Sequence, residues 1–129
     1  MDYTTGPVAP LTFGDAVKRV FSKYAEFSGR ASRAEFWWFI LFLVIVNAAL
    51  GILAAVTGSS IFSLISGVFS LATFIPCLSV SWRRLHDTGR AGGWWFINFV
   101  PAVGAIIFTV FCAQLGEAVA NRFGEVPAN

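Results

Sequence analysis

Two long stretches without a charged side chain dominate the pattern of polar and apolar positions along the chain. Residues 36–82 contain no Asp, Glu, Lys or Arg, and neither do residues 91–116. A turn of small residues at 58–60 divides the first stretch. Because about 20 apolar residues cross a bilayer as an α-helix, the pattern predicts three transmembrane helices. Their predicted bounds are 36–57, 61–82 and 94–115.

The segment before the first predicted span has an amphipathic pattern. Its apolar positions recur at spacings of three and four, the helical period; they are Phe13, Val17, Val20, Phe21 and Tyr24. Polar and basic residues lie between them. We therefore expect an amphipathic helix over 12–27, either lying in the membrane interface or packed on the loops of its own domain. The segment before this helix, residues 1–11, is rich in Thr, Gly and Pro, and this composition predicts a flexible tail.

Local signals mark the ends and the weak points of the predicted spans. Ser32 and Glu35 have capping-box spacing, in which the serine accepts from a first-turn amide and the glutamate reaches back to the cap. Pro76 should kink the second span, with a neighbouring hydroxyl or helix satisfying the freed carbonyl. Pro101 predicts a second kink, in the third span. Residues 116–129 form a more polar tail.

The distribution of Lys and Arg predicts the orientation in the membrane. Basic residues flank the first span on its N-terminal side and recur in the 83–93 loop, whereas the turn at 58–60 has none. The positive-inside rule then places the N-terminus and the 83–93 loop in the cytoplasm, and three spans place the C-terminus outside. Tryptophans mark the same boundary, because indole prefers the headgroup region. The predicted interface anchors are Trp37, Trp38, Trp82, Trp94 and Trp95.

Composition agrees with an all-α integral membrane protein. Hydrophobic residues make up 57% of the 129 residues and charged ones 12%, against roughly half and a quarter in soluble domains. The two cysteines lie within predicted spans, which suits neither a disulfide framework nor a metal site. The net charge is only +2. We expect membrane lipids rather than nucleic acid as partners, and no metal or cofactor.

The candidate functional residues lie in the 83–93 loop and just before the first span. Guanidinium groups bind phosphate through paired donors, so one hypothesis is a cytoplasmic site for anionic lipid headgroups or for a protein partner. The alternative is topological: the same arginines obey the positive-inside rule and pair with nearby carboxylates. The candidate residues are Arg30, Arg33, Arg83, Arg84, His86, Asp87 and Arg90.

His86 and Asp87 do not by themselves predict an enzyme. The chain has no second histidine, so a metal site would lack ligands. If the second span continued helically to His86, Ser79 would lie about two turns away, beyond hydrogen-bond reach. We therefore expect a non-enzymatic protein in which His86 is satisfied beside Asp87 in a polar cluster or senses pH.

A subunit of an oligomeric transporter or channel is the alternative function. The polar and kinked positions available to line a pore are Asn47, Pro76, Asn98 and Pro101. The spans lack the ionisable side chains that usually mark transport pathways, and a lone intramembrane amide more often joins helices. Gly51 and Ala55 have the spacing of small residues that permits close helix packing, which is compatible with a homo-oligomer.

The two basic motifs and the tail resemble those of a known family. Residues 29–37 (GRASRAEFW), 83–90 (RRLHDTGR) and 121–127 (NRFGEVP), with a Trp-Trp pair after the second motif, are similar to the family called domain of unknown function 805. The resemblance covers about residues 27–127. It departs at 91–93, where Ala-Gly-Gly stands in place of an expected Ser-Gly. The resemblance implies a small bacterial inner-membrane protein and implies no activity.

Overall fold

The computed structural model describes residues 11–127, and within them the chain is all-helical. The helices are α1 (Phe13–Ser22), α2 (Arg33–Thr57), α3 (Ser60–Asp87), the 3-10 helix η1 (Gly92–Phe99) and α4 (Val103–Ala113). Within this range the β pairing is limited to one isolated bridge between Asn121 and Gly124. The flexible tail predicted over 1–11 falls almost wholly outside the described residues.

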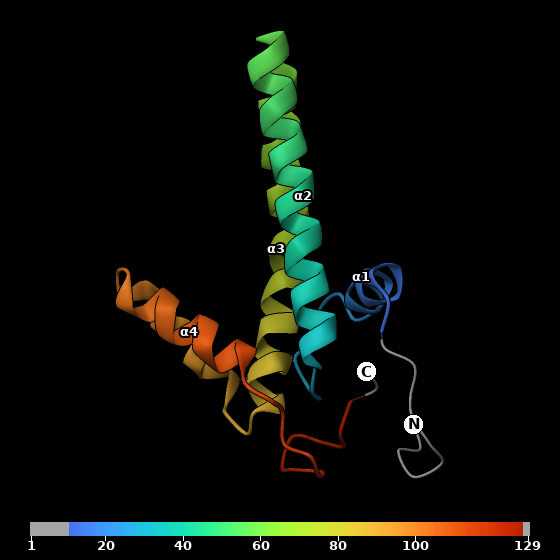
Figure 1. The fold of residues 1–129 in the computed structure, drawn as a ribbon, viewed down its shortest axis with the longest axis vertical. Helices are drawn as coiled ribbons and strands as arrows, with labels where there is room; N and C mark the ends of the chain where they lie inside the picture. Colours follow the sequence, from blue (N-terminus) through green and yellow to red (C-terminus); the bar gives the residue numbers. More distant parts are fainter. Residues whose placement is uncertain (1–10, 128–129) are drawn as a thin grey trace.

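Helices α2 and α3 form the long hairpin at the centre of Figure 1. Ser32 caps α2 as predicted, because its hydroxyl accepts from the Glu35 amide over 3.1 Å. Glu35 does not reach back to the cap as predicted; its carboxylate binds Arg83 instead. At the far end, Gly58 adopts a φ of 65° that lets the chain leave α2, and the Ser59 hydroxyl caps α3.

The arms of this hairpin expose apolar side chains over most of their length. Helix α2 has 25 residues and α3 has 28; these lengths correspond to about 37 and 42 Å, enough for a hydrocarbon core of about 30 Å. Only 6% of the most apolar window of α2, and 11% of that of α3, is buried inside the protein. By length and composition, these are the two helices of the described chain that could cross a membrane. An exposed apolar surface of this extent requires lipid or another protein around it.

Pro76 lies inside α3, and the helix continues through it. Proline has no N–H, so the carbonyl of Ala72, four residues earlier, loses its helical partner. The Tyr24 hydroxyl, in the segment between α1 and α2, donates to that carbonyl over 2.5 Å. The predicted rescue of the freed carbonyl by a neighbouring hydroxyl is confirmed. It also ties the α1–α2 connection to the middle of α3.

The predicted amphipathic helix forms as α1, although it is shorter than predicted at its C-terminal end. The Thr12 hydroxyl caps it by accepting from the Asp15 amide. Its apolar side buries Ala16 and Val20 and packs against α2, and Figure 1 shows α1 beside the foot of the hairpin. Packing of α1 on its own domain is therefore observed, whereas its location in a membrane interface stays a prediction.

The third apolar stretch does not form the single helix predicted over 94–115. It forms η1, a reversal, and α4, which has 11 residues and is therefore only about 16 Å long. Pro101 and the positive φ of Ala102, 60°, turn the chain back, so the expected kink is a reversal. A Cβ at Gly104 would collide with the Ile97 carbonyl oxygen. Glycine thus allows α4 and η1 to pack together beside the hairpin (Figure 1).

The core lies at one end of the hairpin, which we call the base: α1, residues 23–32, the start of α2, the end of α3 with residues 88–91, η1, α4 and residues 114–127. Its buried apolar side chains come from all four α-helices and include Val20, Phe36, Phe39, Val80 and Cys112. Residues 114–127 fold back onto the end of α3. The tail and residues 83–93, of which 83–87 continue α3, therefore lie at the same end of the hairpin. The three-span arrangement predicted from the sequence would have placed them at opposite ends.

Candidate functional site

The base encloses five charged side chains, which we call the buried charge cluster: Arg30, Glu35, Arg83, Arg84 and Asp87. Each is less than 5% exposed, and the two arginines of α3 are not exposed at all. Burying charges is costly unless they are paired and hydrogen-bonded. The partners of these side chains therefore decide which of them could also bind a ligand.

Asp87, the last residue of α3, links two arginines of this cluster. Its Oδ1 accepts from Arg30 Nε over 2.9 Å, and its Oδ2 accepts from Arg84 Nη1. Arg84 precedes Asp87 on the same helix, whereas Arg30 lies before the start of α2. The carboxylate thus joins the beginning of one arm to the end of the other, and both of its oxygens are used within the chain.

Arg30 organises the C-terminal tail. Its Nη1 donates to the carbonyls of Val119 over 2.8 Å and Gly124 over 3.3 Å. Its Nη2 donates to the carbonyls of Glu117 and Asp87. With the Asp87 carboxylate, Arg30 therefore has five acceptors. A guanidinium has five N–H donors. Arg30 is thus the centre around which residues 114–127 fold, and these contacts use its full set of donors.

Arg84 fixes the C-terminal end of α4 to the base. Its Nε donates to the Cys112 carbonyl over 2.9 Å, and its Nη2 donates to the Gln114 carbonyl. Its Nη1 also donates to the Ala31 carbonyl over 3.1 Å. The last carbonyls of a helix have no partner within it and favour a cation. Arg84 supplies both the donors and the positive charge that this helix end needs.

Arg83 and Glu35 form the second ion pair of the cluster. Arg83 Nη1 donates to Glu35 Oε2 over 2.5 Å, and Arg83 Nε donates to the Glu26 carbonyl over 3.2 Å. Within the described residues, Arg83 Nη2 and Glu35 Oε1 are buried without a hydrogen bond. Arg19 of α1 approaches Glu35 Oε1 to 3.8 Å, so α1 adds a positive charge at the edge of this pair.

His86 has a structural position at the edge of the cluster. Its Nδ1 lies 2.9 Å from the Gly29 carbonyl, which can only accept, so Nδ1 carries the proton. Its ring stacks on Phe123, with centroids 4.0 Å apart and planes within 2°. The Asp87 carboxylate is bound by arginines rather than by His86, and the Ser79 hydroxyl bonds to backbone carbonyls. No nucleophile is paired with His86 among the described residues.

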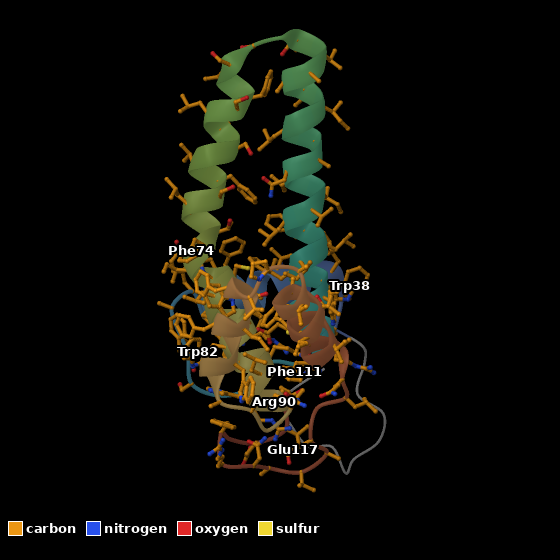
Figure 2. All side chains as sticks on the ribbon, turned by 90° about the vertical axis from the view of Figure 1, so that its left-hand side faces the viewer. Trp38, Phe74, Trp82, Arg90, Phe111 and Glu117 are labelled. Atoms are coloured by element: carbon orange, nitrogen blue, oxygen red, sulfur yellow. The ribbon has the colours of Figure 1, made fainter. Side chains whose placement is uncertain are left out.

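Arg33 and Arg90 lie outside the buried charge cluster. Arg33 is exposed on the first turn of α2, and its Nη1 donates to the Ala113 carbonyl over 3.3 Å. Arg90 Nη1 donates to the Gln114 side chain over 2.8 Å, and its guanidinium lies 3.9 Å from the centroid of the Phe111 ring. Of the seven candidate residues, these two arginines remain at the surface. Figure 2 shows Arg90 and Phe111 together in the lower part of the base.

An open groove lies beside Arg33. It has a volume of about 580 Å³, and its lining residues are Arg33, Ala34, Trp37, Trp38, Leu41 and Ala113. A second cavity, of about 490 Å³, shares Arg33 and Ala34 with this groove and extends along the tail. Apolar walls with one well-placed polar group are typical of sites that bind small organic molecules. We call the first cavity the Arg33 groove.

The tryptophans predicted as interface anchors all belong to the base. Trp37 donates from its indole N–H to the Cys112 carbonyl over 3.2 Å, and Trp38 donates to the Leu11 carbonyl over 3.1 Å. Trp82 is on α3, and the remaining pair, 94–95, is on η1. Figure 2 shows Trp38 near the level at which the arms leave the base, with Trp82 below it. Their contact with lipid headgroups stays a prediction.

The ion pairs of the buried arginines with Asp87 and Glu35 agree with the expected pairing with nearby carboxylates. Their other partners are backbone carbonyls, which every residue carries, so residue type gives no signal for them. The capping-box spacing of Glu35 suggested a second contact, with the cap, that does not form. The described residues contain no group of three or more His, Cys, Asp or Glu side chains that could hold a metal ion. The buried charge cluster can therefore hold the helices of the base together, while Arg33 and Arg90 remain at the surface.

Comparisons with known proteins relate the chain to bacterial membrane proteins. The sequence model of a family described as "Protein of unknown function (DUF805)" matches residues 24–125. Inner membrane protein YhaI of Escherichia coli strain K12 is 40% identical over 108 residues, which cover 84% of this chain and 91% of that protein. Inner membrane protein YhaH of the same strain is 36% identical over 112 residues, covering 84% and 93%. No solved structure matches the chain.

Proposed function

The chain belongs to the DUF805 family, and on that premise we propose that it is a non-enzymatic protein of the bacterial inner membrane that binds anionic phospholipid at its base. In this proposal, α2 and α3 span the bilayer and the base lies at the cytoplasmic headgroups. The observation that carries the proposal is the exposed Arg33 at the wall of an apolar groove. The names of the two relatives support the location.

The distribution of charge supports a cytoplasmic base. All 9 Lys and Arg residues belong to the base; the parts of α2 and α3 that extend beyond it, residues 36–82, contain none, and neither does the turn that joins them. Under the positive-inside rule, a segment so rich in cations stays on the cytoplasmic side. With two spans, the segment before α2 and the tail share that side, in agreement with the contacts between Arg30 and the tail. A tag after residue 129 should then be digested in inverted vesicles and protected in spheroplasts.

The uncharged pair η1 and α4 would enter the same leaflet without crossing it. Its side chains are largely apolar and exposed, among them Phe99, Val103, Ile106 and Val110. Backbone at membrane depth is tolerated where protein supplies its hydrogen bonds, and Arg84 and Trp37 supply them at the end of α4. The start of α2 forms most of the wall of the Arg33 groove, and Ala113, the last residue of α4, completes it.

The chemistry of the Arg33 groove fits a phospholipid better than a soluble anion. Trp37, Trp38 and Leu41 offer apolar surface for an acyl chain, and the guanidinium offers paired donors for a phosphate oxygen pair. Arg33 makes a single hydrogen bond within the described chain, at 3.3 Å, so it retains donors. Arg84 supports the groove indirectly, because it joins the end of α4 to the segment just before α2.

A direct test is native mass spectrometry of the purified protein with phosphatidylglycerol and phosphatidylcholine in equal amounts. We expect the wild type to retain phosphatidylglycerol preferentially. Arg33→Gln should reduce that preference by roughly tenfold, because it removes a charge-assisted hydrogen bond. The preference of the Arg33→Lys variant should lie between those of the wild type and Arg33→Gln, since lysine keeps the positive charge but lacks the paired donors of the guanidinium.

Arg122→Gln is the matched control, because it removes an exposed arginine of the tail that does not line the groove. It should leave lipid retention unchanged. Equal retention of both lipids by the wild type would contradict the proposal, as would equal losses in the Arg33→Gln and Arg122→Gln variants.

A further inference from the structure

A second feature of the hairpin lies far from the base, between Asn47 and the turn that joins the two arms. A groove of about 240 Å³ between α2 and α3 contains the polar side chains Asn47, Ser63 and Ser66 beside Gly51 and Ala54. Asn47 lies ten residues beyond Trp37, or about 15 Å along α2. If the hairpin spans the bilayer as proposed above, Asn47 lies near the middle of the hydrocarbon core, and the groove extends from there toward the turn at 58–60.

The amide of Asn47 is only partly satisfied. Its Nδ2 donates to the Leu43 carbonyl over 2.8 Å, and its Oδ1 accepts from the Ser66 hydroxyl over 3.3 Å. A primary amide has two N–H donors and an oxygen with two lone pairs. Within the described chain, one donor and one lone pair therefore remain. Asn47 is also exposed, so these groups would face the surroundings of the hairpin.

Lipid cannot satisfy these groups, because acyl chains neither donate nor accept hydrogen bonds. The occupant of the groove must carry polar groups at the same depth. A second copy of this chain, inserted in the same orientation, meets that condition automatically: a two-fold axis along the membrane normal places Asn47 opposite Asn47. The absence of a side chain at Gly51 lets a second helix approach closely.

We infer that the groove around Asn47 is the contact surface for a second copy of the chain, joined by hydrogen bonds between the two Asn47 amides. The surface is uncharged and lies on both arms, so the contact aligns two hairpins side by side. The inference rests on the proposed transmembrane placement of the hairpin but not on lipid binding at Arg33, because the two sites lie at different levels of the molecule.

The test is fluorescence energy transfer between donor- and acceptor-labelled copies reconstituted in phosphatidylcholine vesicles over a range of protein-to-lipid ratios. We expect wild-type transfer to rise to a dimer plateau. Asn47→Leu should raise the dissociation constant by about three- to thirtyfold, the range for an interhelical hydrogen bond in a membrane. Asn98→Leu is the matched control, since it makes the same change on η1, outside the groove, and should leave the constant unchanged.

Gly51→Leu provides an independent variant that retains the amide. A Cβ at Gly51 would meet nothing within 4 Å in the chain, so the monomer should fold normally while the larger side chain blocks the second copy. Wild-type transfer no higher than random proximity predicts would overturn the inference, as would wild-type affinity in both the Asn47→Leu and Gly51→Leu variants. Resistance of the vesicle-bound protein to alkaline extraction is measured in parallel. If alkali extracts the protein, both the transmembrane placement and the dimer are overturned. If the protein resists extraction but is monomeric, only the dimer is overturned.

Discussion

The base and the arms of this protein are stabilised in opposite ways. The base buries five charged side chains, and its arginines bind carbonyls from several separate segments. The arms bury little; Val56 is 78% exposed and Leu71 is 79% exposed. The base is thus held by directional bonds within the chain, whereas the arms depend on what surrounds them. Substitutions of similar size should therefore have unequal effects in the two regions.

The largest effect is expected from Asp87→Ala. This change leaves Arg30 and Arg84 buried without their shared carboxylate, and uncompensated buried charge typically costs about 3–5 kcal/mol. The free energy of unfolding, measured by dodecyl sulfate titration in mixed micelles, should fall by that amount. A loss below about 1 kcal/mol would mean that water already solvates these arginines.

A smaller loss is expected from Gly116→Ala. A Cβ at Gly116 would collide with the Asp87 carboxylate, so the tail must move away from Arg30, at a cost of about 1–3 kcal/mol. Limited proteolysis should then cut residues 116–127 faster than in the wild type. Gly93→Ala is the matched control, because a Cβ there meets nothing within 4 Å. Equal cleavage of the two variants would show that the tail is not held by this contact.

Tyr24→Phe tests the boundary between the two regions. It removes the hydroxyl that binds the Ala72 carbonyl freed by Pro76 and should cost about 1 kcal/mol. Adding Pro76→Ala restores the N–H that closes this turn of α3, so the tyrosine change should cost less in the double-mutant cycle. Purely additive effects would show that the hydroxyl and the proline act independently.

The smallest effect is expected in the arms. Val56→Ala should change the free energy of unfolding by less than about 0.5 kcal/mol, because the side chain makes few contacts within the protein. The same titration in micelles provides the measurement. A loss comparable to that of Gly116→Ala would indicate that another protein surface covers this part of α2.

The sequence was sufficient for the hairpin because its determinants are local. Two apolar stretches of spanning length, a serine cap at Ser32 and a turn at Gly58 each act over a few residues. The need for a hydroxyl near Pro76 was also local, since it follows from the missing N–H. The identity of that hydroxyl could not be read from the local sequence, because Tyr24 lies 48 residues from Ala72.

The third apolar stretch was not predictable in the same way. A spanning helix and a folded pair of short helices are equally apolar, so hydropathy does not distinguish them. The folded pair requires a glycine at position 104, because a Cβ there would collide with the Ile97 carbonyl. The buried charge cluster was only partly predictable for the same reason. Its arginines could be identified in the sequence as candidate residues, but a backbone carbonyl that accepts from them, such as that of Val119, has no residue-specific signature.

The contacts of Arg30 impose an order on the biogenesis of the protein. Its carbonyl acceptors in the tail lie 87 to 94 residues later in the chain. At a synthesis rate of about 5–20 residues per second, they leave the ribosome roughly 5–20 s after Arg30 does. Its ion-pair partner Asp87 comes 57 residues after it, so Arg30 is an unpaired cation just before α2 until the end of α3 has been made. In the topology proposed above, such a charge keeps a segment in the cytoplasm. In that topology the same guanidinium first helps to orient the chain and afterwards, once the tail arrives, becomes the centre of a folded base.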